Sequence, residues 1–283
     1  MEQPIIASRS VTQYILKTFN LRADKRLGQN FLVDENVVKN IAIATDLKEG
    51  DKVLEVGPGI GTLTQALAET GADVTAVELD RRLIPVLGKT LDGYNNVNVI
   101  NDDILKLDIN KAMGGETFKV AANLPYYITT PIIFSFLEQD LPVERLVVMV
   151  QKEVAQRMVA KPGSKIYGVL SVSIQYYTEP EIAFIVPSKA FIPAPKVDSA
   201  VVVCKKRAVP PVDVDEKIFF RTVKAAFSVR RKMLNNALKN MGITSDQAKE
   251  WLAIAGIDSS RRGETLSMEE FAALSNSFTK ITK

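Results

Sequence analysis

The sequence predicts an α/β fold with a mostly parallel sheet, followed by a small all-α C-terminal domain. Short apolar runs alternate with amphipathic segments up to about residue 151, which is typical of a parallel sheet covered by helices on both faces. Four amphipathic segments without strand patterns follow a proline-containing stretch, 208–215, that indicates a linker. We therefore expect one domain over residues 1–207 and a second over 208–283.

The expected elements alternate in order along the first domain. Strands are expected over 52–56, 72–80 and 96–100, within 118–127, and over 144–151, with helices over 62–70, 81–91 and 130–139. Helices over 151–160 and 167–177 then precede two late strands, 181–186 and 199–206. We expect these two strands to add antiparallel pairing at the sheet edge. The C-terminal helices are expected within 216–227, 230–241, 245–256 and 267–278.

The composition excludes several classes of catalysis and metal binding. The 283 residues include no histidine and one cysteine, Cys204, which rules out Ser-His-Asp and Cys-His catalysis and Cys/His zinc sites; we expect no metal. No apolar run approaches the ~18 residues of a membrane-spanning helix, and the N-terminus lacks a signal-peptide pattern. A cytoplasmic location is therefore expected, as is a monomer, because no heptad pattern is evident.

The charge is unevenly distributed along the chain. Residues 31–150 contain 10 Lys/Arg and 18 Asp/Glu, a net charge of −8, whereas the remaining residues contain 26 and 15, a net charge of +11. This asymmetry favours contact with a polyanion, although solvated surface charge is the alternative for any one cluster. The candidate RNA-binding residues are Arg22, Lys25, Arg26, Lys205, Lys206, Arg207, Arg230, Arg231, Lys232, Arg261 and Arg262.

A glycine-rich segment, EVGPGIGTLT at 55–64, lies between an expected strand and helix. Glycine lets the backbone turn sharply and approach a ligand, and the helix N-terminus offers free N–H groups. A dinucleotide fingerprint requires a third glycine at position 62, which is Thr62. The pattern is instead usual in S-adenosylmethionine methyltransferases, with a ligand-free tight turn as the alternative.

Acidic residues follow the next two expected strands. Glu78 ends one strand, where its carboxylate would accept hydrogen bonds from ribose hydroxyls, and Asp103 follows the next, where it would accept one from an adenine amino group. Either residue alone is more often a surface acid or a helix cap. Their shared position at strand carboxyl ends, where open α/β sheets bind ligands, indicates a nucleoside site.

The segment NLPYYITTP, 123–131, lies at the end of the fourth expected strand. Asn123 Oδ1 and the Leu124 carbonyl are suitable acceptors for the two protons of an adenine amino group, and Tyr126 offers a ring face for the base. Such acceptors would favour a pyramidal nitrogen with its lone pair aligned on a methyl donor, so no strong base is required. The alternative is a proline turn in which Tyr126 and Tyr127 cap the core.

NLPYYITTP resembles a motif of the KsgA-type ribosomal RNA adenine dimethyltransferases. KRLGQNFLVD (25–34), LEVGPGIGTLT, VELD, NDDIL and FIPAPKVDSAVV (191–202) resemble further motifs of that family, and FSVRRKMLNNAL and RRGETLSMEEF resemble its helical tail. The resemblance covers about residues 22–275. Departures are few: Tyr127 stands where relatives have Asn, and we expect it not to alter the reaction.

The resemblance implies a Rossmann-like class I methyltransferase sheet, mostly parallel with one antiparallel edge strand, and a helical domain that binds RNA. It implies that two adjacent adenosines of small-subunit (16S) rRNA are converted to N6,N6-dimethyladenosine, with a role in subunit biogenesis. It also implies that Tyr126 and Phe191 sandwich the target base. The implied S-adenosylmethionine site comprises Asn30, Leu32, Gly57, Gly59, Glu78, Asp103 and Asn123.

Three other functions remain open. A large-subunit rRNA methylase of the antibiotic-resistance type shares several motifs, although the RRGETLSMEEF tail favours the small-subunit enzyme. A non-catalytic ribosome assembly factor would bind rRNA and gate subunit maturation, although the intact cofactor loop and the N-L-P-Y motif argue against loss of activity. A nicotinamide dehydrogenase is opposed by Thr62 and by the absence of histidine.

Overall fold

The computed structural model describes residues 4–229 and 232–281, and the chain divides into two compact units. The first unit comprises residues 1–155 and 181–206, and the second comprises 156–180 and 207–283. Within the described residues, no helix combines the length and apolar character needed to cross a membrane.

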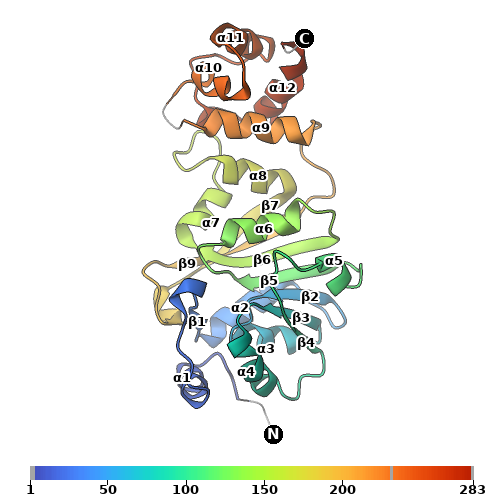
Figure 1. Ribbon diagram of the computed structural model, residues 1–283, viewed down its shortest axis with the longest axis vertical. Coiled ribbons are helices and arrows are strands. Elements are labelled where there is room, and N and C mark those ends of the chain that lie inside the picture. The colour runs from blue at the N-terminus through green and yellow to red at the C-terminus, as the bar shows by residue number, and fades with distance from the viewer. Residues whose placement is uncertain (1–3, 230–231, 282–283) are drawn as a thin grey trace. The chain divides into compact units, whose positions relative to one another are not determined.

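A seven-stranded sheet in the order β4-β3-β2-β5-β6-β9-β7 organises the α/β part of the chain (Figure 1). Its strands are β2 (Lys52–Val56), β3 (Asp73–Glu78), β4 (Val97–Asn101), β5 (Phe118–Asn123), β6 (Val143–Gln151), β7 (Thr178–Val186) and β9 (Ser199–Lys206). The pairs from β4 to β6 are parallel, whereas β9 pairs antiparallel with β6. This confirms the mostly parallel sheet with an antiparallel addition. The antiparallel strand lies one position in from the edge, because β7 occupies the outer position.

Helices and short elements of the first unit surround this sheet. They are α1 (Arg9–Thr18), η1 (Lys25–Leu27), α2 (Glu35–Thr45), α3 (Thr62–Ala68), η2 (Arg81–Leu83), α4 (Ile84–Thr90), α5 (Ile109–Ala112), α6 (Thr129–Leu137) and η3 (Ser188–Ala190). Helix α7 (Lys152–Met158) begins in the first unit and ends in the second. A separate two-stranded ladder joins β1 (Phe31–Leu32) to β8 (Phe191–Ile192). Buried side chains of α2 and α3, including Ile41 and Leu67, pack with sheet residues such as Val147 in one core cluster.

The ladder between β1 and β8 fixes the segment that precedes α2. Phe31 pairs with Ile192 and Leu32 pairs with Phe191 in the antiparallel register. The Asp34 carboxylate then accepts hydrogen bonds from two backbone N–H groups of α2, at 3.1 and 3.2 Å, as an N-cap. The C-terminal part of the 28–33 segment is thereby held, which matters because this segment forms one wall of the cavity described below.

The second unit has its own helical core. It contains α8 (Val169–Tyr177), α9 (Glu216–Phe227), α10 (Leu234–Ala237), η4 (Leu238–Met241), α11 (Ser245–Ile254), η5 (Gly263–Thr265), α12 (Met268–Ser277) and η6 (Phe278–Lys280). Trp251 is fully buried, and its indole Nε1 donates to the Leu274 carbonyl at 2.7 Å. Apolar packing with a satisfied indole thus forms a core distinct from that of the sheet.

Residues 156–180 belong to this second unit although strands of the sheet precede and follow them. Tyr176 of α8 stacks on Phe219 of α9, with ring centroids 5.2 Å apart. Tyr167 and Val172 lie in the same buried cluster as Trp251. Sequence order suggested a division at residue 207, but the aromatic face of α8 packs with the C-terminal helices.

Candidate active site

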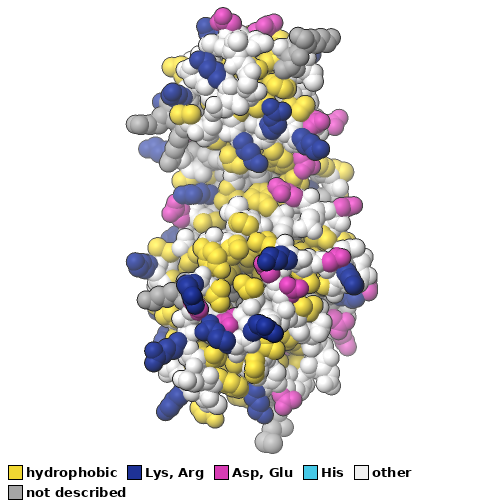
Figure 2. Space-filling model, in the orientation of Figure 1, with side chains coloured by type: hydrophobic (Ala, Val, Ile, Leu, Met, Phe, Trp, Pro, Cys, Tyr) yellow, Lys and Arg dark blue, Asp and Glu magenta, His cyan; other side chains and the backbone are white. Residues whose placement is uncertain are grey.

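A cavity opens in the first unit at the carboxyl ends of several parallel strands. It encloses about 1110 Å³ of empty space, including the part open to solvent, and Figure 2 shows a hollow with hydrophobic side chains on the face of this unit. The lining residues are 27–32, 55–60, 62–63, 77–79, 83, 102–104, 123–128 and 132. Pockets of this kind are large enough for a nucleoside-sized ligand.

The cavity brings together nine of the sequence-predicted site residues. These are Asn30, Leu32, Gly57, Gly59, Glu78, Asp103, Asn123, Leu124 and Tyr126. They come from the segment before α2 and from the ends of β2, β3, β4 and β5. Parallel strands place their carboxyl ends at one rim, which is why residues far apart in sequence converge here.

The glycine loop after β2 exposes its backbone to this cavity. Gly57 has φ +69°, in the left-handed region that favours glycine, and a β-carbon built there would meet no atom within 4 Å. Gly59 has φ +62°, and its β-carbon would lie 3.5 Å from the Phe31 ring. Backbone strain would therefore oppose a side chain at either position, and the space beside Gly57 is open to a ligand.

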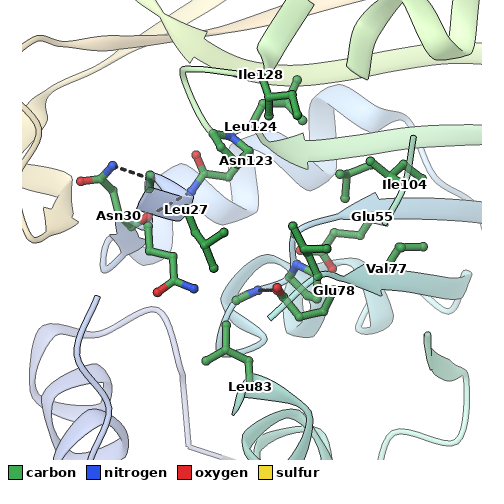
Figure 3. Close-up of a pocket in the computed structure, with 18 of the residues that line it drawn as sticks. Leu27, Asn30, Glu55, Val77, Glu78, Leu83, Ile104, Asn123, Leu124 and Ile128 are labelled. Carbon is green, nitrogen blue, oxygen red and sulfur yellow. Dashed lines mark hydrogen bonds between the residues drawn. The ribbon is translucent and has the colours of Figure 1, made fainter. Parts of the chain in front are cut away.

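Glu78, at the end of β3, supports the glycine loop. The side chain is buried, with Oε2 accepting from the Gly59 N–H at 3.1 Å and Oε1 accepting from the Asp80 N–H at 2.7 Å (Figure 3). Desolvation by burial raises the pKa of this carboxyl, partly opposed by those N–H donors. Each oxygen retains a lone pair, so Glu78 can accept further hydrogen bonds from a ligand.

Asp103, after β4, is held in a turn at the same rim. Its Oδ1 accepts from the Leu105 N–H at 3.1 Å, and its backbone carbonyl accepts from the Lys106 N–H at 2.8 Å. The Lys106 ammonium lies 3.7 Å from Oδ2 as an exposed ion pair. The carboxylate is thus oriented by its own turn and remains accessible from the cavity.

Glu55 is a site residue that the sequence reasoning did not single out. It lies in β2, is 1% exposed, and its Oε2 has no hydrogen-bond partner among residues 4–229 and 232–281. Burial raises the pKa of this carboxyl to about 8; the Thr64 hydroxyl opposes this shift and the charge of Glu78 adds to it. The sequence does contain a signal for this residue: an acid lies within the expected buried strand KVLEV, and such strands are normally apolar throughout.

The acidic groups on this wall fit a nucleoside ligand that also carries positive charge. Glu55 presents an unpartnered buried oxygen, Glu78 and Asp103 present carboxylates, and the loop at Gly57 leaves its backbone uncovered. An unpaired buried polar oxygen is costly, so a ligand that forms a hydrogen bond with it gains affinity there.

Asn123, at the end of β5, leaves its side-chain oxygen free. Its Nδ2 donates to the Asn30 carbonyl at 3.3 Å, and Asn30 in turn donates through Nδ2 to the Gly28 carbonyl at 3.0 Å. Figure 3 shows Asn123 and Asn30 side by side at the cavity wall. The Leu124 N–H donates to the Met149 carbonyl at 3.2 Å. In the described part of the chain, neither Asn123 Oδ1 nor the Leu124 carbonyl accepts a hydrogen bond.

Tyr126 and Phe191 occupy different environments. Tyr126 lines the cavity, and its hydroxyl is hydrogen-bonded to Ser199 Oγ at 2.7 Å; burial raises the pKa of the phenol. Phe191 is 1% exposed, pairs with Leu32 in the short ladder and belongs to the main core cluster. It is not among the described residues that line the cavity. A base-stacking role for Phe191 therefore stays a prediction.

Several predicted RNA-binding cations are exposed. These are Arg22, Arg26, Lys205, Lys232 and Arg262. Arg230 and Arg231 lie outside the described residues, and of Lys25 only the backbone, in η1, is described. The exposed set is distributed over both units.

Three other predicted cations have partners within the protein. Lys206 Nζ donates to the Leu141 carbonyl at 2.7 Å. Arg207 contacts Glu179 at 2.8 Å and also donates to two backbone carbonyls. The Arg261 guanidinium pairs with Glu270 and donates to the Thr265 carbonyl at 2.8 Å. These guanidinium and ammonium groups have a structural function in their own units, whatever else they contact.

Comparisons with known proteins identify the family of the chain. The family model for ribosomal RNA adenine dimethylase matches residues 5–280. A ribosomal RNA small subunit methyltransferase A from Alkaliphilus oremlandii is 49% identical over 282 residues, covering 97% of this chain and 98% of that protein.

Two solved structures share the fold over most of the chain. A dimethyladenosine transferase from Plasmodium falciparum superposes with a TM-score of 0.74 at 26% identity, covering 89% of this chain and 98% of that one. The 23S rRNA methyltransferase ErmE superposes with a TM-score of 0.68 at 27% identity, covering 88% and 100%. With a family model that spans nearly the whole sequence, this chain belongs to the ribosomal RNA adenine dimethylase family.

Proposed function

We propose that this enzyme transfers methyl groups from S-adenosylmethionine to N6 of two adjacent adenosines in 16S rRNA, forming N6,N6-dimethyladenosine during small-subunit biogenesis. The family and the name of the 49% identical relative support this assignment. The observation that carries it is the pair of unpartnered acceptors, Asn123 Oδ1 and the Leu124 carbonyl, on the wall of a nucleoside-sized cavity.

The methyl donor would be held on the side formed by the glycine loop. Glu78 would accept from ribose hydroxyls and Asp103 from the adenine amino group, while Gly57 leaves room for the ligand against the loop. Asn30, Leu32, Gly59 and the Asn123 backbone would complete this wall. Bound there, S-adenosylmethionine supplies an electrophilic methyl group on a sulfonium.

The acceptor pair would prepare the amine of the target adenosine. An exocyclic amino nitrogen is a poor nucleophile, because its lone pair is delocalised into the ring. In the first transfer, hydrogen bonds from its two protons to Asn123 Oδ1 and the Leu124 carbonyl favour a pyramidal nitrogen with a localised lone pair; in the second transfer, the one remaining proton bonds to only one of these acceptors. These acceptors are preorganised, because Asn123 Nδ2 and the Leu124 N–H are already hydrogen-bonded to the protein. Transfer breaks the sulfonium–methyl bond and leaves a cationic methylated nitrogen, which is acidic and loses its proton to solvent, so no histidine or other strong base is needed.

The target base would be extruded from its stack and bound against aromatic side chains. Tyr126 lines the cavity with its hydroxyl anchored on Ser199, which fixes the ring. Phe191 would form the opposing plate if its ring becomes accessible when RNA binds, since it is 1% exposed in the unliganded protein.

The basic residues would bind the phosphate backbone of the rRNA. The exposed cations, among them Arg22, Lys205 and Arg262, support this role more directly than the internally paired Arg207 and Arg261. We propose a methyltransferase domain over residues 1–207 and an RNA-binding helical domain over 208–283, the latter sharing its core with residues 156–180. We further propose that the protein is a cytoplasmic monomer whose partner is the small ribosomal subunit.

A methylation assay with three substrates tests this proposal. The protein is incubated with labelled S-adenosylmethionine and under-methylated small subunits, large subunits or free rRNA, and the modified nucleosides are identified by mass spectrometry. Dimethyladenosine in the small-subunit reaction is the expected result. Transfer only to large-subunit RNA would favour the resistance-type methylase, and particle binding without transfer would favour an assembly factor.

A further inference from the structure

Tyr127 is an exposed aromatic residue at the cavity that the proposed mechanism does not use. Tyr127 is 59% exposed. Its neighbour Tyr126 is half-buried, and the Tyr126 hydroxyl is hydrogen-bonded to Ser199 Oγ. Both residues line the same cavity. A cavity-lining residue with this exposure stands at the opening, where one side of it faces solvent.

The Tyr127 side chain lies beside the loop that contains Gly28. Gly28, with φ +62°, carries no side chain, and a β-carbon built there would lie 3.4 Å from Tyr127 Cδ1 and 3.5 Å from Pro125 Cβ. A β-carbon at Gly28 would thus be in ordinary van der Waals contact with the Tyr127 ring, so the ring lies beside the Gly28 backbone. More than half of the residue remains exposed.

We propose that Tyr127 is a second stacking platform, which binds the nucleotide next to the adenosine held in the cavity. This inference rests on the proposed function, since it assigns a neighbouring base to the same RNA substrate. A base drawn out of its stack leaves its neighbour with one uncovered face. A flat aromatic ring at the cavity opening restores that lost stacking contact.

The geometry favours a base over other occupants of this position. Tyr127 directly follows Tyr126 in the chain, and both residues line the cavity that contains the acceptor pair. Stacking on one ring suits any base, because every base has a π-face, and it requires no hydrogen-bond partner from the protein. Two adjacent target adenosines would thus use the same pair of rings in turn.

A different role for Tyr127 is purely structural: the ring would hold the loop at Gly28, and with it Asn30, in place for the methyl donor. The two roles predict different defects. Loss of a stacking platform weakens RNA binding and leaves donor binding intact. Loss of loop support weakens donor binding and leaves RNA binding intact.

The test compares Tyr127→Phe, Tyr127→Leu and Tyr127→Ala with wild type and with Tyr14→Ala. Tyr14 is a matched control, because it is 70% exposed and lies in α1, and is not among the cavity-lining residues. For each protein, the KM for under-methylated small subunits, kcat and the Kd of S-adenosylmethionine are measured, the last by calorimetry without RNA.

The stacking role predicts that KM rises about 5- to 150-fold in Tyr127→Ala and Tyr127→Leu, as expected for the loss of one base–aromatic stack. The donor Kd and kcat should change by less than about twofold. Tyr127→Phe and Tyr14→Ala should resemble wild type. A Leu variant with wild-type KM would overturn the inference, because Leu fills the space but offers no flat ring.

A raised donor Kd with an unchanged KM would also overturn the inference and would assign Tyr127 to loop support. Failure of the proposed function is distinguished by the wild-type reaction, which would then yield no dimethyladenosine in small subunits. In that case, direct binding of the same variants to the particle still tests Tyr127, with the Leu and Ala variants expected to bind at least about fivefold more weakly.

Discussion

The two sides of the cavity differ in how their polar groups are satisfied. On the glycine-loop side, both Glu78 oxygens already accept backbone hydrogen bonds. On the side of Asn123, the donors are used within the protein, while Asn123 Oδ1 and the Leu124 carbonyl accept nothing in the described residues. Glu78 on the first side is therefore already held by the protein, although Glu55 Oε2 on that side has no partner in the described residues, and the second side keeps both of its acceptors for a partner that arrives later.

This difference separates binding from chemistry. Groups that hold the donor act in the ground state, so their loss should appear as weaker donor binding. Groups that localise the lone pair of the amine act in the transition state, so their loss should appear in kcat. Substitutions on the two sides should thus give separate kinetic defects.

The largest effect is expected for Asn123→Ala. Without Oδ1 the amine loses one of two preorganised acceptors, and kcat should fall about 100- to 1000-fold. Binding to the small subunit should stay within about twofold of wild type, as measured with labelled particles. Wild-type turnover by this variant would remove Asn123 from the mechanism.

Glu78→Gln should impair donor binding by about 10- to 100-fold, since one charged acceptor is lost. Calorimetric titration at several pH values sharpens this test. Burial raises the pKa of Glu78, so donor affinity of the wild type should decline as pH falls through that raised pKa, at a higher pH than for an ordinary carboxyl. A donor Kd unaffected by the substitution would show that Glu78 only braces the loop.

In the protein without S-adenosylmethionine, Glu55→Gln should alter how the stability of the fold depends on pH. The pKa of Glu55 is about 8 in the folded protein, against an ordinary value of 4.5. The folded state therefore binds more protons than the unfolded state between these values, and stability falls as pH rises from about 5 to 8. Thermal unfolding should show a higher Tm for Glu55→Gln than for wild type at pH 9, and little difference at pH 5. The same difference in Tm between the two proteins at pH 5 and at pH 9 would contradict a raised pKa for Glu55.

The smallest effects should separate two neighbouring arginines. Arg261→Ala breaks the pairing with Glu270 and the bond to the Thr265 carbonyl, and should lower stability by roughly 1 kcal/mol, or about 2–4 °C in Tm. Arg262 is exposed, with Glu264 3.9 Å away, so Arg262→Ala should leave Tm unchanged and weaken particle binding at low salt. Equal Tm shifts in the two variants would count against this division.

The sequence allowed the sheet and most of the cavity to be predicted, because both follow from local patterns. Short apolar runs marked the parallel strands, and the polar residues that end them, such as Glu78 and Asn123, converge at one rim by the geometry of parallel strands. The grouping of α8 with the C-terminal helices could not be predicted in this way. It depends on contacts such as Tyr176 with Phe219, which join residues 43 positions apart in the chain.

Features that depend on long-range partners were also missed. Glu55 begins the glycine-rich segment EVGPGIGTLT, but its unpartnered oxygen and its raised pKa follow from complete burial, which depends on the fold. The sequence predicted Arg207 and Arg261 to be RNA-binding cations. Their hydrogen-bond acceptors, Glu179 and Glu270, could be identified only from the folded structure. Phe191 was expected beside the target base and lies in the core of the unliganded protein.

The most direct test of the acceptor pair is a crystal structure with S-adenosylhomocysteine and an RNA fragment that contains the target adenosine. The account predicts that the adenine N6 lies within about 3.2 Å of both Asn123 Oδ1 and the Leu124 carbonyl oxygen. It would be contradicted by an adenine whose amino group contacts neither oxygen, or by an Asn123 amide directed away from the bound base.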